Sequence, residues 1–196
     1  MKLSVLSVCV AVFIGGCANK AHLPYNGKID KTSYQTEECR RELSRGLEII
    51  KSKKIDKIVV LKKQRVLMTY RKGKMVNKFR ISLGKNGDKG HKIRAGDYRT
   101  PIGHYYIVRK KCDSRLYKSL MISYPDREDI ARARKLGVKS GGYITIHAQP
   151  KWNANGIGDD YTLSHDWTEG CIAVSNKAMD KLWRAVQCGV KIDIHP

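Results

Sequence analysis

The sequence predicts a mainly β domain with peripheral helices. Short runs of β-branched and aromatic residues recur between turns rich in Gly, Lys and Pro, which is typical of strands. Apolar residues at helical spacing occur in only a few segments. The strand-like runs span residues 58–61, 66–70, 75–83, 104–109, 120–124, 143–147, 171–174 and 190–194. Helices are expected at 33–52, 126–137 and 176–188.

Local signals support these elements in chain order. The basic residues 62–65 separate the first two strands, and a turn at Gly73 precedes the third. Asp126 can cap the second helix. The last helix carries Met179, Leu182, Trp183 and Val186 on one side, and Gly189 is expected at its end. The many strands and few helices lead to the mainly β assignment.

The first 16 residues have the features of a secretory signal. Lys2 precedes an apolar run, which ends in Gly15-Gly16-Cys17. A cysteine directly after Gly-Gly resembles a bacterial lipobox, so we expect cleavage before Cys17 and acylation of its thiol. The alternative is an ordinary signal peptide that contains a cysteine. Ala18, rather than Asp, then directs the lipoprotein to the outer membrane of a Gram-negative bacterium, by resemblance to lipoproteins of such bacteria.

Three further segments complete the predicted organisation. Residues 17–32 are polar and form a lipidated tether, and residues 33–56 form an N-terminal helical appendage. Residues 57–196 are long enough to bury the core of one domain.

The formal net charge of +21 indicates an anionic partner. Export argues against nucleic acid and leaves the carboxylates of peptidoglycan and the phosphates of lipids. The alternative is that the lysines only keep the surface soluble. No cysteine and histidine spacing resembles a zinc site, and no metal or organic cofactor is expected.

The six cysteines have different expected fates. Cys9 leaves with the signal, and Cys17 is lipidated. An oxidising compartment permits disulfides among the remaining four. If Cys171 is catalytic it stays out of them, so Cys39, Cys112 and Cys188 can form one bond and leave one thiol, and the sequence does not choose among the three pairings.

Cys171 is the candidate nucleophile. It follows a polar turn that ends in Gly170 and leads into an apolar strand, which would fix the sulfur at an exposed turn. Gly170 has no side chain, so a substrate carbonyl could approach the backbone and its N–H groups could bind an oxyanion. A buried structural cysteine is the alternative.

His147 is the candidate base. It ends the run 143–147, where the strand opens into a loop. A neutral imidazole can take a thiol proton and return it to a leaving amine. The glycine-rich basic loop 84–103 lacks P-loop spacing and could instead line a groove for an anionic peptide.

Together these segments resemble the catalytic domain of the L,D-transpeptidases, also called the YkuD-like family, over residues 58–194. Thr100-Pro101-Ile102-Gly103, Ile146-His147-Ala148 and Thr168-Glu169-Gly170-Cys171 match its segments in the family's order, and Asp166-Trp167-Thr168 resembles a proteobacterial subgroup.

The resemblance implies a β-sandwich and a cell-wall enzyme of peptidoglycan biosynthesis and cell shape. Cys171 would attack the carbonyl between an L-centre and a D-centre of a stem peptide and form a thioester. His147 would be the proton donor and acceptor, oriented by the backbone carbonyl of Ala148. Substrate contacts are expected from Trp167, Thr168, Glu169, Thr100 and Gly103.

Two departures concern the acceptor. Glu169 stands where the family carries a histidine, and Ala173 stands where an arginine is common. The sequence therefore leaves three functions open: transpeptidase, hydrolase of the same L,D bonds or of a protein's attachment to peptidoglycan, and non-catalytic peptidoglycan-binding lipoprotein. A peptidoglycan-linked lipoprotein is a possible partner, and the expected location is the periplasm.

Overall fold

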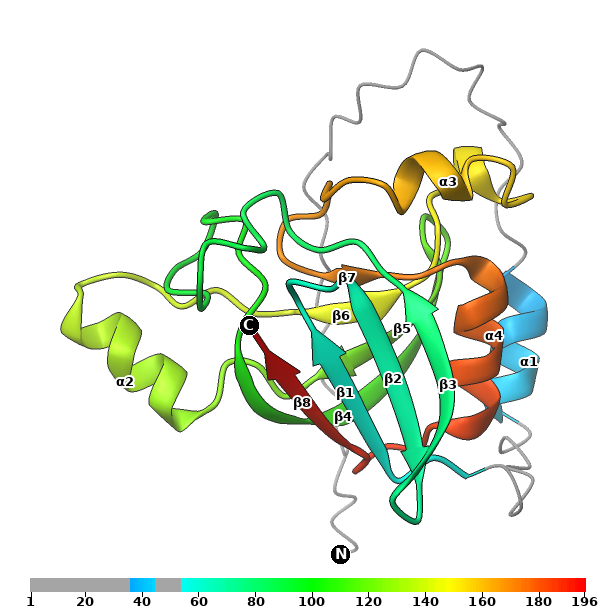
Figure 1. Ribbon diagram of the computed structural model, residues 1–196, viewed down its shortest axis with the longest axis horizontal. Coiled ribbons are helices and arrows are strands. Elements are labelled where there is room, and N and C mark those ends of the chain that lie inside the picture. The colour runs from blue at the N-terminus through cyan, green and yellow to red at the C-terminus, as the bar shows by residue number, and fades with distance from the viewer. Residues whose placement is uncertain (1–35, 45–53) are drawn as a thin grey trace, which may run out of the picture.

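The computed structural model describes residues 36–44 and 54–196 (Figure 1). The expected signal, the lipidation site Cys17, the tether and the remainder of the helix expected at 33–52 lie outside the described residues. Within these residues, no helix is long and apolar enough to cross a membrane.

In the described part of the chain, eight strands form one sheet, and its two ends run in different layers (Figure 1). Pairs β1–β8 and β6–β7 are parallel and the others are antiparallel. In spatial order the strands are β3 (Lys74–Arg80), β2 (Val66–Arg71), β1 (Lys57–Leu61), β8 (Lys191–His195), β4 (Gly103–Asp113), β5 (Tyr117–Ile122), β6 (Thr145–His147) and β7 (Ile172–Ala173).

Strand β4 makes the sheet curl. Its first part, Gly103 to Tyr106, pairs with β8, and its second part, Ile107 to Asp113, pairs with β5. The chain after β3 then reaches the far edge, where Ser82 bridges to Ala173. The mainly β prediction is confirmed, and the expected sandwich takes the form of one sheet curled around a shared core.

Helix α4 (Asn176–Ala185) closes one side of that core. The Ser175 hydroxyl caps it by accepting from Ala178 N–H at 3.1 Å. Met179, Leu182 and Trp183 are almost fully buried on its inner face, as their spacing predicts. The helix ends three residues before the predicted Cys188, because Val186 is already extended and Gly189 turns the chain toward β8.

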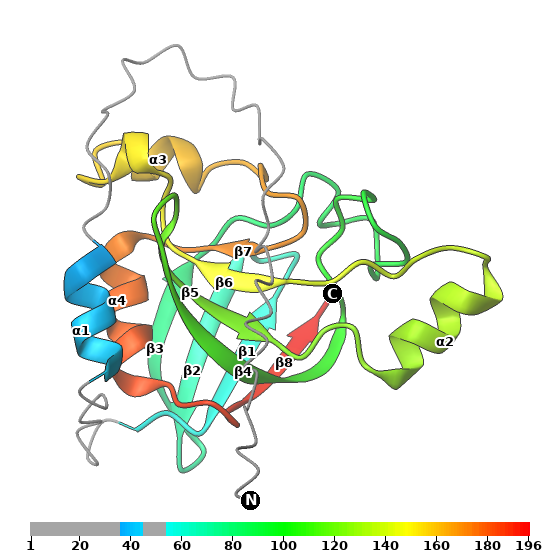
Figure 2. The same ribbon diagram turned by 180° about the vertical axis from the view of Figure 1, so that it is seen from behind.

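The other helices are short. In α2 (Arg127–Lys135), Asp126 forms the predicted cap, and Asp129 completes a capping box. Figure 2 shows α2 standing away from the sheet, opposite α1 (Thr36–Ser44) and α4. The 3₁₀ turn η2 (Lys151–Asn153) and α3 (Asp159–Thr162) were not predicted, because they are shorter than a readable helical period.

A disulfide joins Cys39 of α1 to Cys112 of β4. Of the three pairings that the sequence leaves open, the structure has this one. Cys188, which is exposed, and Cys171, which is buried, lie outside the disulfide. Glu42 adds a hydrogen bond from the Trp183 indole at 3.0 Å and an ion pair with Lys118 at 3.3 Å. Helix α1 is thus attached to the sheet by covalent and polar contacts.

Candidate active site

Cys171 lies where the loop after α3 enters β7. Its side chain is 7% exposed. The Thr145 hydroxyl donates to Cys171 Sγ at 3.6 Å, and the thiol points at the carbonyl of Tyr143 at 3.8 Å. The sulfur is therefore held against the start of β6.

His147 ends β6 and shares a face with Thr145, because residues two apart in a strand point the same way. The parallel register pairs His147 with Ala173, so His147 and the Thr145–Cys171 contact lie along neighbouring strands. His147 Nδ1 is 2.7 Å from the carbonyl oxygen of Ala148. Since a carbonyl only accepts, Nδ1 carries a hydrogen, and Nε2 is the ring nitrogen whose lone pair is available in this neutral tautomer. Trp167 packs edge-on against this ring, with centroids 5.5 Å apart.

Two glycines allow backbone to approach the cysteine turn closely. Gly170 has φ +126°, and a Cβ there would be 2.7 Å from the Arg99 carbonyl oxygen. A Cβ on Gly84 would be 2.1 Å from the Tyr98 carbonyl oxygen and 2.8 Å from Gly170 Cα. The backbone of residues 98–99 therefore packs directly on the cysteine turn. A side chain at Gly84 or Gly170 would prevent this contact.

Buried threonines hold this turn together. Thr168 Oγ1 donates to the Cys171 carbonyl at 2.7 Å and accepts from Gly170 N–H at 3.1 Å. Thr100 Oγ1 accepts from Gly84 N–H at 3.0 Å. In this structure the Gly170 N–H is engaged within the turn rather than directed at a substrate.

The five residues predicted to contact the substrate differ in how far they are buried. Thr100, Trp167 and Thr168 are buried, and the Trp167 indole donates to the Thr162 carbonyl at 2.9 Å. Gly103 is half-buried and pairs with Ile194 at the start of β4. Glu169 is the exposed residue of the five. Direct contact with a substrate stays a prediction for all of them.

Asp166 fastens the nucleophile loop to the β1–β2 turn and to the segment that follows β3. Its Oδ1 accepts from Arg65 Nε and from Leu83 N–H, both at 2.9 Å. Arg65 Nη2 lies 2.5 Å from Oδ2, which completes a forked ion pair. Sequence reasoning noted Asp166 only as part of a motif and missed this role.

A buried carboxylate organises the loop 84–103. Asp97 accepts from Lys92 Nζ at 2.7 Å and from the N–H groups of Ile93, Arg94 and Arg99 at 2.7, 3.0 and 3.1 Å. Burial acts to raise the pKa of Asp97, but these hydrogen bonds outweigh it and lower the pKa below its ordinary value.

Lys62 is the second buried polar support. It is 2% exposed, and its Nζ donates to the carbonyls of Gly90 and Thr100, both at 2.8 Å. Burial, together with the charges of Arg65 and Arg99, lowers the pKa of Lys62 to about 8. Local sequence does not reveal this role, because Lys62 is one of several basic residues in the predicted turn 62–65.

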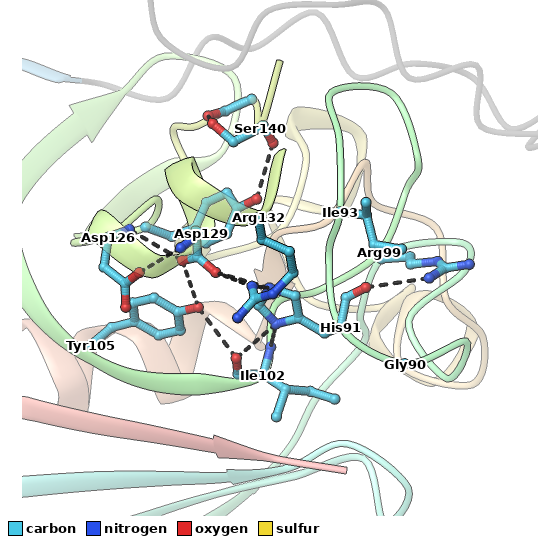
Figure 3. Close-up of polar contacts among 12 residues, drawn as sticks. Gly90, His91, Ile93, Arg99, Ile102, Tyr105, Asp126, Asp129, Arg132 and Ser140 are labelled. Carbon is cyan, nitrogen blue, oxygen red and sulfur yellow. Dashed lines mark hydrogen bonds and ion pairs between the residues drawn. The ribbon is translucent and has the colours of Figure 1, made fainter. Parts of the chain in front are cut away.

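A polar junction joins the same loop to α2, and Figure 3 shows it. The Ile102 N–H donates to His91 Nδ1 at 3.1 Å, and His91 Nε2 lies 2.9 Å from the Asp129 carboxylate. Tyr105 and Arg132 also donate to Asp129, at 3.0 and 2.9 Å. Among the described residues, no group of three His, Cys, Asp or Glu side chains is arranged to hold a metal ion.

Known structures share this fold. The cell-shape-determining protein Pgp2 of Campylobacter jejuni superposes with a TM-score of 0.54 at 24% identity, over 72% of this chain and 47% of Pgp2. Bd1075 of Bdellovibrio bacteriovorus gives 0.50 at 21% identity, over 74% and 49% of the two chains.

The curled sheet is that of an L,D-transpeptidase catalytic domain. Residues 56–194 match the L,D-transpeptidase catalytic domain family, YkuD, and the chain belongs to this family. A curated relative, YafK of Escherichia coli strain K12, is 30% identical over 120 residues, which are 57% of this chain and 40% of YafK. The chain thus spans less than half the length of that relative.

Proposed function

We propose that this protein is an exported cysteine transpeptidase that acts on L,D bonds of peptidoglycan stem peptides. The observation that carries the proposal is the position of His147. Its Nδ1 lies 2.7 Å from the Ala148 carbonyl oxygen, and it shares strand β6 with Thr145, whose hydroxyl contacts Cys171 Sγ. Membership of the L,D-transpeptidase family supports the substrate class.

The proposed reaction has two steps. His147 Nε2 takes the thiol proton, and Cys171 Sγ attacks the carbonyl carbon of the L-centre. The C–N bond breaks, and the imidazolium gives its proton to the leaving D-amino acid, so a thioester remains. An acceptor amine then loses a proton to His147 and attacks the thioester, which forms the new amide and restores the thiol. The Ala148 carbonyl keeps the imidazole in the required tautomer throughout.

Hydrolysis of the same bond is the second candidate, and one feature favours it. Glu169 is exposed two residues before Cys171, where the resemblance leads us to expect a histidine. A carboxylate there can attract an incoming amine or position water. Transfer is preferred because it is the activity that gives the family its name.

Partitioning of the thioester tests these alternatives. The domain would be incubated with a tetrapeptide muropeptide and rising concentrations of a D-amino acid, followed by mass spectrometry. Transfer predicts exchanged product that grows at the expense of tripeptide. Tripeptide alone at every concentration would establish the hydrolase. If no D-alanine is released under any condition, the substrate is another L,D bond, such as one that joins a protein to peptidoglycan.

Export and anchoring are also proposed. The Cys39–Cys112 disulfide supports an oxidising compartment such as the periplasm. Cys17 is the proposed lipidation site. Metabolic labelling with a clickable fatty acid should tag the protein, and Cys17→Ala should abolish the tag. An untagged wild-type protein would contradict the anchor without affecting the proposed chemistry.

A further inference from the structure

Among the residues that the structure describes, the backbone adopts the left-handed conformation at five residues other than glycine: Arg65, Lys72, Tyr98, Tyr117 and Tyr143, with φ of 53°, 49°, 56°, 65° and 57°. Four of these have a local contact that holds them. Lys72 occupies the β2–β3 turn, Arg65 closes a turn by its N–H to the Lys62 carbonyl at 3.1 Å, and the Tyr117 hydroxyl donates to Asp180 at 2.9 Å. Tyr98 is held in the same way, because Asp97 Oδ1 accepts from the Arg99 N–H at 3.1 Å and the Tyr98 carbonyl accepts from the Asn86 N–H at 3.0 Å. Tyr98 and Tyr143 are the two that we consider further, because their backbone lies beside the cysteine turn.

Tyrosine is an unfavourable residue at these two positions. A bulky side chain in the left-handed region costs about 1–2 kcal/mol, whereas glycine adopts it freely. Tyr98 is 37% exposed and Tyr143 is 44% exposed. Much of each side chain thus remains in water, so burial offsets only part of the strain. Strained residues of this kind gather at functional sites.

Both tyrosines lie next to the candidate nucleophile, on two different loops. The Tyr143 carbonyl is 3.8 Å from Cys171 Sγ. The Tyr98 carbonyl packs on Gly84, and the next carbonyl, of Arg99, packs on Gly170. The Tyr143 carbonyl therefore faces Cys171 itself, whereas the Tyr98 carbonyl accepts from the Asn86 N–H at 3.0 Å and the neighbouring Arg99 carbonyl reaches the cysteine turn.

The two loops are fixed to each other, so the tyrosines are held in place. Ala95 N–H donates to the Lys139 carbonyl at 2.8 Å, and a Cβ on Gly141 would be 3.2 Å from Ala95 Cα. Asp97 braces the first loop, and the His91–Asp129 contact ties that loop to α2, which leads into the second (Figure 3).

The ammonium group of Lys85 lies near the Tyr98 ring. Lys85 Nζ lies 5.5 Å from the centroid of the Tyr98 ring, and the Lys85 residue is exposed. Exposed aromatic faces with a nearby amine suit a ligand that combines an aliphatic chain with a carboxylate. The stem peptide of the proposed function, with a diamino diacid at its L-centre, has this chemistry.

We infer that Tyr98 and Tyr143 are specificity-determining residues that hold the aliphatic part of an acidic stem peptide beside Cys171, with Lys85 facing its carboxylate. This inference rests on the proposed function. It assigns the two rings a binding role and leaves proton transfer to His147.

Glycine substitutions separate binding from folding. Tyr98→Gly and Tyr143→Gly remove the ring and also relieve the backbone strain, so the melting temperature should be unchanged or higher. KM for a tetrapeptide muropeptide should rise about 10-fold or more, with kcat reduced much less. Tyr98→Phe and Tyr143→Phe should stay near wild-type KM. Tyr106→Ala is the matched control, because Tyr106 is 48% exposed on β4.

Wild-type KM in both glycine variants would overturn the inference, and so would phenylalanine variants as poor as the glycine ones. Calorimetric binding of the same muropeptide to Cys171→Ala, with and without Tyr98→Gly or Tyr143→Gly, needs no turnover. If the wild-type enzyme turns over no muropeptide, the proposed function fails. Weaker binding in the glycine variants would then still support the inference, and equal or absent binding would overturn it.

Discussion

The loops around Cys171 and the helical layer of α1 and α4 are stabilised in different ways. In the loops, buried polar groups bind backbone directly, as Lys62 and Asp97 do. In the helical layer, Trp183 and its apolar neighbours fill the core, and a disulfide fixes α1. Irregular loops lack a strand ladder, so their backbone groups need side-chain partners, whereas a helix face gains from buried area.

The two regions should therefore contribute differently to the geometry of the candidate site and to the stability of the fold. A polar support in the loops sets where the cysteine turn and the tyrosines lie, so its loss should change catalysis as well as folding. A contact in the helical layer should change folding and leave the chemistry recognisable.

The largest expected effect is on turnover. Cys171→Ala and His147→Ala should each lower turnover of muropeptides by about 10⁴-fold or more, and the double variant should be little worse, because the two act as one unit. Thermal unfolding should change far less than activity. Wild-type activity in Cys171→Ala would refute the proposed chemistry.

The next largest effect lies in the helical layer. Cys112→Ser opens a loop with a sequence separation of 73 residues. The chain-entropy relation gives a loss of about 4 kcal/mol in the free energy of unfolding. Urea unfolding would measure it, with Cys188→Ser as the control, because Cys188 is an exposed free thiol. A loss of catalysis at a temperature where Cys112→Ser is still folded would contradict the claim that the helical layer affects folding and not the chemistry.

The Asp97 carboxylate should affect both the stability of the fold and catalysis. Asp97→Asn leaves the buried Lys92 amine without its carboxylate partner, and we expect a loss of about 3 kcal/mol together with lower kcat/KM. Because the folded-state pKa of Asp97 is lowered, its contribution is present above the unfolded pKa and disappears as the pH falls through the folded pKa. Asp88→Asn, at an exposed position in the same loop, is the control. Equal effects of the two substitutions on unfolding and activity would contradict the assigned role.

The last expected effect is a dependence of stability on pH, and it is small at any single pH near neutrality. The folded-state pKa of Lys62 is about 8, below its ordinary value of 10.5, so the unfolded chain binds more protons between these values. The stability of the wild type relative to Lys62→Met should therefore rise as the pH increases from 8 to 10.5. Paired urea titrations would measure this slope, with Lys63→Met at the exposed neighbouring position as the control. A flat difference would show that Lys62 titrates normally.

Local sequence patterns predicted much of the domain. Alternating apolar runs located the strands, and Asp126 located the start of α2, because both signals depend on neighbours in the chain. Cys171 and His147 could also be chosen from sequence, since each stands at a junction between a polar turn and an apolar strand. Their catalytic roles stay proposals until the substitutions above are measured.

The tertiary structure decided what depends on distant residues. It chose Cys39–Cys112 among three pairings and brought Arg65 to Asp166 across 101 positions. It buried Lys62 and placed Tyr98 and Tyr143 at the same cysteine turn. A sequence pattern reports the period of one segment, whereas burial, pairing and backbone strain arise only when segments pack against one another.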